Sequence, residues 1–151
     1  MSGKTLLIDE AEFIDFELFG ILSSYSDAAQ FVYHVNMNFG TEFVRSEDLD
    51  VLIENQISYY PVFEWEDLQT GLYYNIIKNA SYTMNSPENS GSLSTLFDVS
   101  PVLISQFKEY NYLLKISGAS ADGFPLQENT FIQIVTKLDT SSVKTINRLI
   151  F

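Results

Sequence analysis

The chain has 151 residues, a net charge of −12 and no cysteine, which excludes disulfide bonds, thiol nucleophiles and thiolate metal sites. With 46% hydrophobic and only 19% charged residues, the composition excludes a largely disordered chain. The length suits one domain built around one core. We therefore predict a single domain over residues 1–151.

The negative charge is confined to the first half of the chain. Residues 1–70 hold 14 acidic and 2 basic residues, a net charge of −12, whereas residues 71–151 hold 6 of each. Such a field repels phosphate backbones and anionic lipid, so we expect no nucleic-acid and no membrane binding, while a basic protein partner stays open. Solubility is the simpler explanation of the charge. The apolar runs are too short for a signal peptide or a membrane span, which predicts a cytoplasmic protein.

A strand followed by a helix is predicted near the start of the chain. Residues 13–22 alternate apolar and acidic side chains, with Asp15 and Glu17 on one side, which is the period of a half-buried strand. From residue 27 to about residue 38 the apolar residues recur at helical spacing. Asp27 resembles a helix N-cap and Gly40 a C-terminal stop.

A hairpin is predicted in the middle of the chain. Residues 59–66 and 72–79 are rich in aromatic and β-branched residues, and the short loop DLQTG joins them. Pro61 cannot donate a ladder hydrogen bond, so the first of these strands should begin there or lie at an edge. Before the hairpin, residues 41–53 read as an extended segment with a break near Ser46.

The second half begins with a polar, turn-rich stretch, which predicts a flexible loop at about residues 81–95. Ser100 and Pro101 suit the N-cap and first position of a short helix. This helix should lead into a strand over residues 110–118.

A second main helix and a last strand are predicted near the end. Phe131, Ile134, Val135 and Leu138 recur at helical spacing within residues 127–138, and residues 143–151 read as a strand. Strand–helix–strand units then flank the central hairpin. We therefore predict an α+β fold with a single antiparallel or mixed sheet and two main helices on one face.

The segment ISQFKEYNY, residues 104–112, resembles the I-P-E-x-x-x-V-D-Y motif of a family of small bacterial proteins, the IPExxxVDY family. Ile104 and Tyr112 match the two ends of the motif, and the defined positions between them differ, namely Ser105, Gln106, Tyr110 and Asn111. Four further segments resemble the family in the same order along the chain: DFELFGI, FVRSEDL, YYNIIKNAS and VKTINRLIF. The family has no assigned activity, cofactor or catalytic residue, so the resemblance implies no site.

Two interpretations of this motif stay open. If the acidic residues of the family motif are catalytic, Gln106 and Asn111 cannot replace them as general acid or base, and this chain has lost an activity. If the motif is a helix-to-strand corner, an amide preserves its hydrogen-bonding shape. We favour the corner.

Two pairs of carboxylates are the candidate site residues. Asp15 with Glu17, and Glu64 with Glu66, lie at i, i+2 and so share one face of their strands. If these strands are neighbours, the four groups could hold Ca²⁺ or Mg²⁺, or divide acid and base roles. The simpler reading is a solvated sheet face, because polar residues alternate outward on such strands anyway.

No catalytic motif is present. His34 is the single histidine and is predicted to be a partly buried structural residue on the first helix. The sequence lacks G-x-S-x-G, G-x-x-x-x-G-K-[ST] and G-x-G-x-x-G, which disfavours a serine hydrolase and a nucleotide site. We predict no catalytic residue and no cofactor.

Aromatic residues are abundant, with 12 Phe and 9 Tyr. Trp65 and the Tyr and Phe residues around it lack neighbouring Lys or Arg, so core or interface packing explains them better than nucleic-acid stacking. We predict a non-catalytic protein-interaction module that self-associates as a homodimer and engages a basic partner. The alternative is a small-ligand or divalent-cation binding protein, or an enzyme, that uses the acidic face.

Overall fold

The protein is an antiparallel sheet with one α-helix in the part of the chain that the computed structural model describes, residues 16–81, 101–118, 126–141 and 143–151. The strands of the main sheet are β1 Phe16–Ser23, β2 Val44–Arg45, β5 Val62–Glu66, β6 Tyr73–Lys78, β7 Tyr112–Ser117 and β8 Ile132–Lys137. Their order is β2-β5-β6-β7-β1-β8, and every neighbouring pair is antiparallel. Two further strands, β3 Leu49–Ile53 and β4 Gln56–Tyr60, form a separate hairpin.

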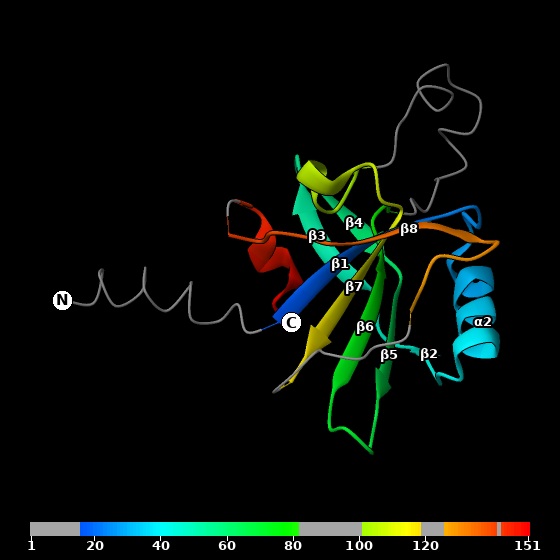
Figure 1. Cartoon of the computed structure of the whole chain (residues 1–151). Helices are drawn as coiled ribbons and strands as arrows, with labels where there is room; N and C mark the ends of the chain where they lie inside the picture. The colour runs from blue at the N-terminus through cyan, green and yellow to red at the C-terminus, as the bar shows by residue number, and fades with distance from the viewer. Residues whose placement is uncertain (1–15, 82–100, 119–125, 142) are drawn as a thin grey trace.

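Both faces of the main sheet are covered (Figure 1). Helix α2, Ala28–Phe39, packs on one face, where Phe31, Val32 and Val35 join a core with residues of β5, β6 and β7. On the other face lie two 3₁₀ helices, η2 Ser105–Phe107 and η3 Ile146–Leu149. They build a second core with β1 and β7 residues. The fold therefore has three layers.

The predictions for the first strand and the first helix are confirmed. In β1, Phe16 and Leu18 are buried while Glu17 is half-buried, as the alternation predicts. Helix α2 begins after Asp27, whose carboxylate accepts a hydrogen bond from Gln30 N at 2.8 Å. It ends at Gly40, which adopts the left-handed conformation with φ 66° that glycine reaches without steric cost.

The central hairpin is also confirmed. Strands β5 and β6 pair from Val62 opposite Ile77 to Glu66 opposite Tyr73, and β5 begins directly after Pro61. The hairpin that precedes it along the chain was not predicted. β3 and β4 are joined by Glu54 and Asn55, both with positive φ, 51° and 64°, which is the conformation of a type I′ turn. The predicted break near Ser46 is confirmed, since β2 ends at Arg45 and β3 begins at Leu49.

The second main helix was a wrong prediction. Residues 132–137 form the edge strand β8, which pairs with β1. Asn129 sets its start, because the Asn129 side chain accepts hydrogen bonds from the backbone N–H groups of Phe131 and Ile132. The β-branched run Ile132, Ile134, Val135, Thr136 favours a strand, and this preference outweighs the helical spacing.

The predicted final strand was also wrong. Val143, Ile146 and Leu149 are all buried, and their spacing of three is the period of a 3₁₀ helix, which η3 forms. The predicted short helix after Pro101 is likewise absent: Val102 forms a β-bridge with Ala80 and the helical turn starts only at Ser105. The C-terminal strand–helix–strand unit therefore does not exist in the described residues. The predicted loop at 81–95 lies, beyond Ser81, outside them.

Tyr112 links the sheet to helix α2. Because its phenol is buried, we expect the fold to lose stability at alkaline pH. Its ring stacks on Phe31 with 4.0 Å between centroids, and its hydroxyl donates to Tyr25 O at 2.8 Å. Burial, and then the charge of Asp27, raises the pKa of Tyr112, and burial is also the main cause that raises the pKa of Tyr60, Tyr73 and Tyr74.

In the unfolded chain these phenols ionise at about pH 10, whereas in the folded protein they stay protonated to higher pH. The free energy of unfolding therefore keeps its full value below about pH 10 and falls as the pH rises above it. Denaturant unfolding at about pH 9 and at about pH 11 measures this loss. The Tyr112→Phe variant should lose less stability than the wild type between the two values. An equal loss in both proteins would refute the assignment to Tyr112.

Candidate functional site

The motif segment 104–112 is a structural corner. η2 turns the chain and β7 follows at Tyr112. The buried side chain of Asn79 holds this turn: its amide nitrogen donates to Phe107 O at 3.0 Å and Tyr110 O at 3.2 Å, and its oxygen accepts from Ile104 N at 3.0 Å. This arrangement agrees with the corner interpretation, with a 3₁₀ turn as the helix.

Asn111 of the same segment extends the pairing of β7 with β1. Its side-chain oxygen accepts from Ser23 N and its amide nitrogen donates to Ser23 O, both at 2.9 Å. An aspartate at this position could not donate to Ser23 O at neutral pH. The Tyr110 ring lies against Gly20, where an added Cβ would be 2.6 Å from the ring. Gln106 is exposed and lies at the surface of the turn.

Among the described acidic candidates, Glu17 does not converge with Glu64 and Glu66. β6 and β7 separate the strand of Glu17 from the strand of Glu64 and Glu66, and the register places Glu17 opposite Ile116 on the α2 face. Glu17 instead forms an ion pair with Lys137 at 3.1 Å. Asp15 lies outside the described residues. Across the described ranges, no three Asp, Glu or His side chains are grouped so that they could hold a metal ion.

One of the candidates, Glu64, lies in a polar pocket on the face opposite α2. The register aligns Glu64, Asn75 and Lys115 across the adjacent strands β5, β6 and β7. The next row toward the strand ends holds Glu66, Tyr73 and Ser117. The polar pocket has a volume of about 800 Å³ and is lined by Glu64, Tyr73, Asn75, Lys115, Ser117, Phe151 and residues 45–47. Pockets of this size accommodate small ligands.

Lys115 is the least expected residue of the polar pocket. It lies on a central strand with 6% of its surface exposed, and burial of a charge is costly unless the charge has partners. Its ammonium group donates to Leu149 O at 2.6 Å and lies over two aromatic rings, 4.9 Å from the Phe16 centroid and 4.2 Å from the Phe151 centroid. Such cation–π contacts stabilise a desolvated ammonium.

Tyr73 and Glu64 form the acidic side of the polar pocket. The Tyr73 hydroxyl donates a short hydrogen bond to Glu64 Oε2. Burial, followed by this hydrogen bond, raises the pKa of Tyr73, and a phenol, whose usual pKa is about 10, is a protonated donor at neutral pH in any case. The pocket thus has a carboxylate on β5, neutral hydrogen-bonding groups on β6 and an ammonium on β7.

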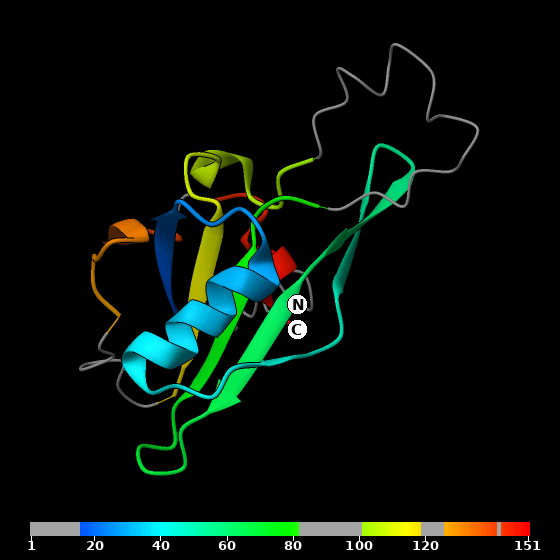
Figure 2. The same cartoon turned by 90° about the vertical axis from the view of Figure 1, so that its right-hand side faces the viewer.

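A second surface is formed by the outer face of the β3–β4 hairpin, which projects from the main sheet (Figure 2). On its inner face Leu49, Val51 and Ile53 pack against the core that η2 and η3 help to form. On its outer face the directly opposed residues Leu52 and Ile57 are 67% and 55% exposed. Tyr59, also exposed, lies opposite Asp50. We call this surface, Asp50, Leu52, Ile57 and Tyr59, the hairpin face.

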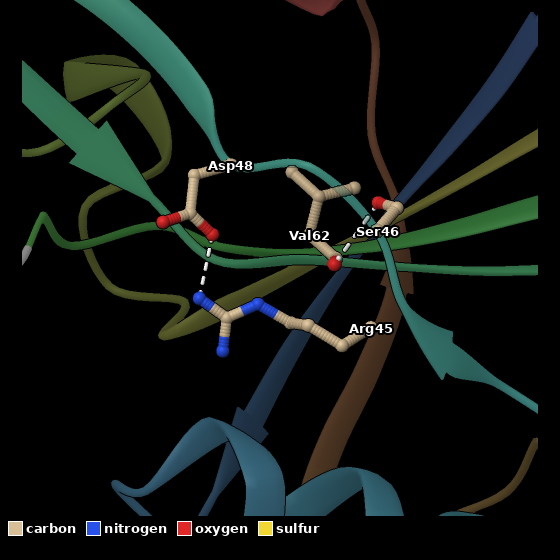
Figure 3. Close-up of polar contacts among 4 residues, drawn as sticks. All are labelled: Arg45, Ser46, Asp48 and Val62. Carbon is tan, nitrogen blue, oxygen red and sulfur yellow. Dashed lines mark hydrogen bonds and ion pairs between the residues drawn. The ribbon is translucent and has the colours of Figure 1, made fainter.

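The break between β2 and β3 fixes the direction of the hairpin. Both the backbone N–H and the hydroxyl of Ser46 donate to Val62 O, at 3.0 and 3.1 Å. Arg45 forms an ion pair with Asp48 at 2.5 Å across the break (Figure 3). These contacts replace the strand ladder where residues 46–48 leave the sheet, so the hairpin is anchored at its base.

Trp65 and His34 are packing residues. Trp65 stacks on Tyr74 with 5.0 Å between ring centroids, within the core under α2, as core packing predicts. His34 is half-buried and stacks on Tyr25 at 4.6 Å, in agreement with a structural histidine.

No protein-family model, curated protein or solved structure matches the chain. The resemblance to the IPExxxVDY family therefore stays a prediction. Among the helices of the described residues, none is both long and apolar enough to cross a membrane.

Proposed function

We propose that this chain is a non-catalytic interaction module that self-associates through strand β3. The observation that carries the proposal is the hairpin face, on which Leu52 and Ile57 leave more than half of their surfaces in water. Contiguous exposed apolar residues mark interaction sites more often than scattered ones do. Within the described residues, a strand edge without a partner strand lies beside this face.

The open edge belongs to β3. Within the described residues, β3 pairs only with β4. Because a two-residue turn is flanked by a hydrogen-bonded pair, here Ile53 and Gln56, the amide groups of Asp50 and Leu52 point to the other side. They can pair with the same strand of a second copy. An antiparallel two-fold pairing centred on Val51 would place Asp50 of one copy opposite Leu52 of the other.

The two edge strands of the main sheet carry features that discourage pairing with another chain, and β3 does not. β2 has only two residues, and β8 ends in Lys137. Short strands and lysines are common protections against edge-to-edge pairing. β3 has neither a lysine nor a proline. The proposed register also keeps the two Asp50 carboxylates from lying directly opposite each other, which would be destabilising.

Sedimentation equilibrium tests the proposal. The wild type should form a dimer, and Leu52→Asp should weaken dimerisation at least about tenfold, because it places two carboxylates opposite each other twice per dimer and removes apolar contact. Leu52→Lys should retain the dimer, since the introduced ammonium group would face Asp50 of the other copy. The matched control is Leu68→Asp, at an 86% exposed apolar position in the β5–β6 loop.

Two results would contradict the proposal. A wild type that is monomeric at every concentration would refute self-association. Equal weakening by Leu52→Asp and Leu52→Lys would refute the register. The basic partner of the acidic half stays a prediction, and the divalent-cation alternative receives no support from the described acidic residues.

A further inference from the structure

Arg45 lies at the base of the β3–β4 hairpin. It is the only lysine or arginine between Lys4 and Lys78, and its guanidinium group binds Asp48 at 2.5 Å (Figure 3). The Phe63 ring centroid lies 5.4 Å from the guanidinium carbon. These two contacts hold the side chain in place, yet 47% of its surface is exposed. Because a guanidinium group has five N–H donors, Arg45 can bind a second carboxylate.

Glu54 lies at the other end of β3, in the turn of the hairpin. It is exposed, and it forms no ion pair within the described residues. Its φ of 51° is in the left-handed region, which glycine, asparagine and aspartate adopt more readily than glutamate. Residues that keep such a conformation at a cost are concentrated at functional sites. The turn thus presents a carboxylate that has no counter-charge among the described residues.

The register of the proposed dimer brings the two ends of the strand together. Asp48 and Glu54 are each three residues from Val51, so an antiparallel pairing centred on Val51 places Glu54 of one copy opposite Asp48 of the other. Pairs of this type have their Cα atoms about 5.5 Å apart, and directly opposed side chains lie on the same face of the sheet. Without a cation between them, the two carboxylates would repel each other at both ends of the interface.

We infer that Arg45 bridges Asp48 of its own chain and Glu54 of the second copy, once at each end of the interface. The inference rests on the proposed self-association through β3, and it extends that interface to the break between β2 and β3. The bridge converts the repulsion between two carboxylates into an attraction. It also selects the register, because a shift by two residues would move Glu54 about 7 Å away from Arg45.

A charge exchange, measured by sedimentation equilibrium, tests whether Arg45 acts across the two copies. Arg45→Glu should weaken the dimer at least about tenfold, because each of the two bridges becomes a group of three carboxylates. Addition of Glu54→Arg to that variant should bring the dissociation constant back to within about threefold of the wild-type value. The matched control adds Glu128→Arg instead and should leave the dimer weak, since this exposed residue precedes β8, at the opposite edge of the main sheet from β2.

The charge exchange separates a bridge between copies from a local role of Arg45. Within one chain, Asp48 and Glu54 are six residues apart along the strand, or about 20 Å, so Glu54→Arg cannot repair the base of its own hairpin. An undiminished dimer of Arg45→Glu, or equal dissociation constants for the two double variants, would overturn the inference. If Leu52→Asp still disrupts the wild-type dimer, such a result leaves self-association through β3 standing, whereas a monomeric wild type overturns both.

Discussion

Replacement of Asn79 by Ala should destabilise the fold by about 2 kcal/mol or more, since three backbone groups would each lose a hydrogen bond, at about 1–3 kcal/mol for a group left unsatisfied, while Phe107 O keeps the bond from Tyr110 N at 3.0 Å. The groups are Phe107 O, Tyr110 O and Ile104 N, all within 3.2 Å of the Asn79 side chain. Asn79 is 2% exposed, so these groups lie away from bulk water. Guanidinium chloride unfolding measures the change.

Asn147→Ala is the matched control, because Asn147 is exposed in η3 on the same face of the sheet. It should change the free energy of unfolding by no more than about 0.5 kcal/mol. A loss below about 1 kcal/mol for Asn79→Ala would mean that the corner is held by its apolar contacts alone.

Phe31→Ala should cost about 3–5 kcal/mol of stability, the usual range for removal of a buried aromatic side chain. Phe31 is completely buried, stacks on Tyr112 and meets Phe131 edge-on at 6.1 Å. It is the contact at which α2, β7 and the segment before β8 come together. Thermal and denaturant unfolding measure the effect.

Tyr33→Ala is the control on the same helix, because Tyr33 is an exposed aromatic residue. It should change stability by no more than about 0.5 kcal/mol. Similar losses for both variants would contradict the packing of α2 through its Phe31 face.

The sequence predicted the elements whose local signals agree with their surroundings. β1 alternates along its length, and α2 has both a capping aspartate and a terminating glycine. The β5–β6 hairpin has strong strand formers on either side of a loop with a glycine. In each case the propensity, the pattern and the terminating residues point to the same element.

The wrong predictions arose where two periods compete. In residues 131–138 the apolar residues fit a helix, but Ile132, Ile134, Val135 and Thr136 are β-branched and pair with β1 at the edge of the sheet. Residues 143–151 were predicted to be a strand, whereas burial follows every third residue. Only the tertiary contacts decide between such readings.

The polar pocket could not be predicted because it depends on strand order. Glu64 was identified as a candidate, but its neighbours Asn75 and Lys115 are 11 and 51 residues away in the numbering of the chain. Nothing in the local pattern of β7 marks Lys115, which sits among apolar residues. The β3–β4 hairpin was missed because Glu54 and Asn55 are not a typical type I′ pair.

Hydrogen exchange of β3 as a function of protein concentration tests self-association most directly. The amides of Asp50 and Leu52 should be protected at high concentration and exchange rapidly on dilution, because under the proposal a second copy pairs with them and no strand of the described residues does. The amide of Val51, which faces β4, should be equally protected at both concentrations. If Asp50 and Leu52 exchange at the same rate at high and low concentration, β3 is not the interface.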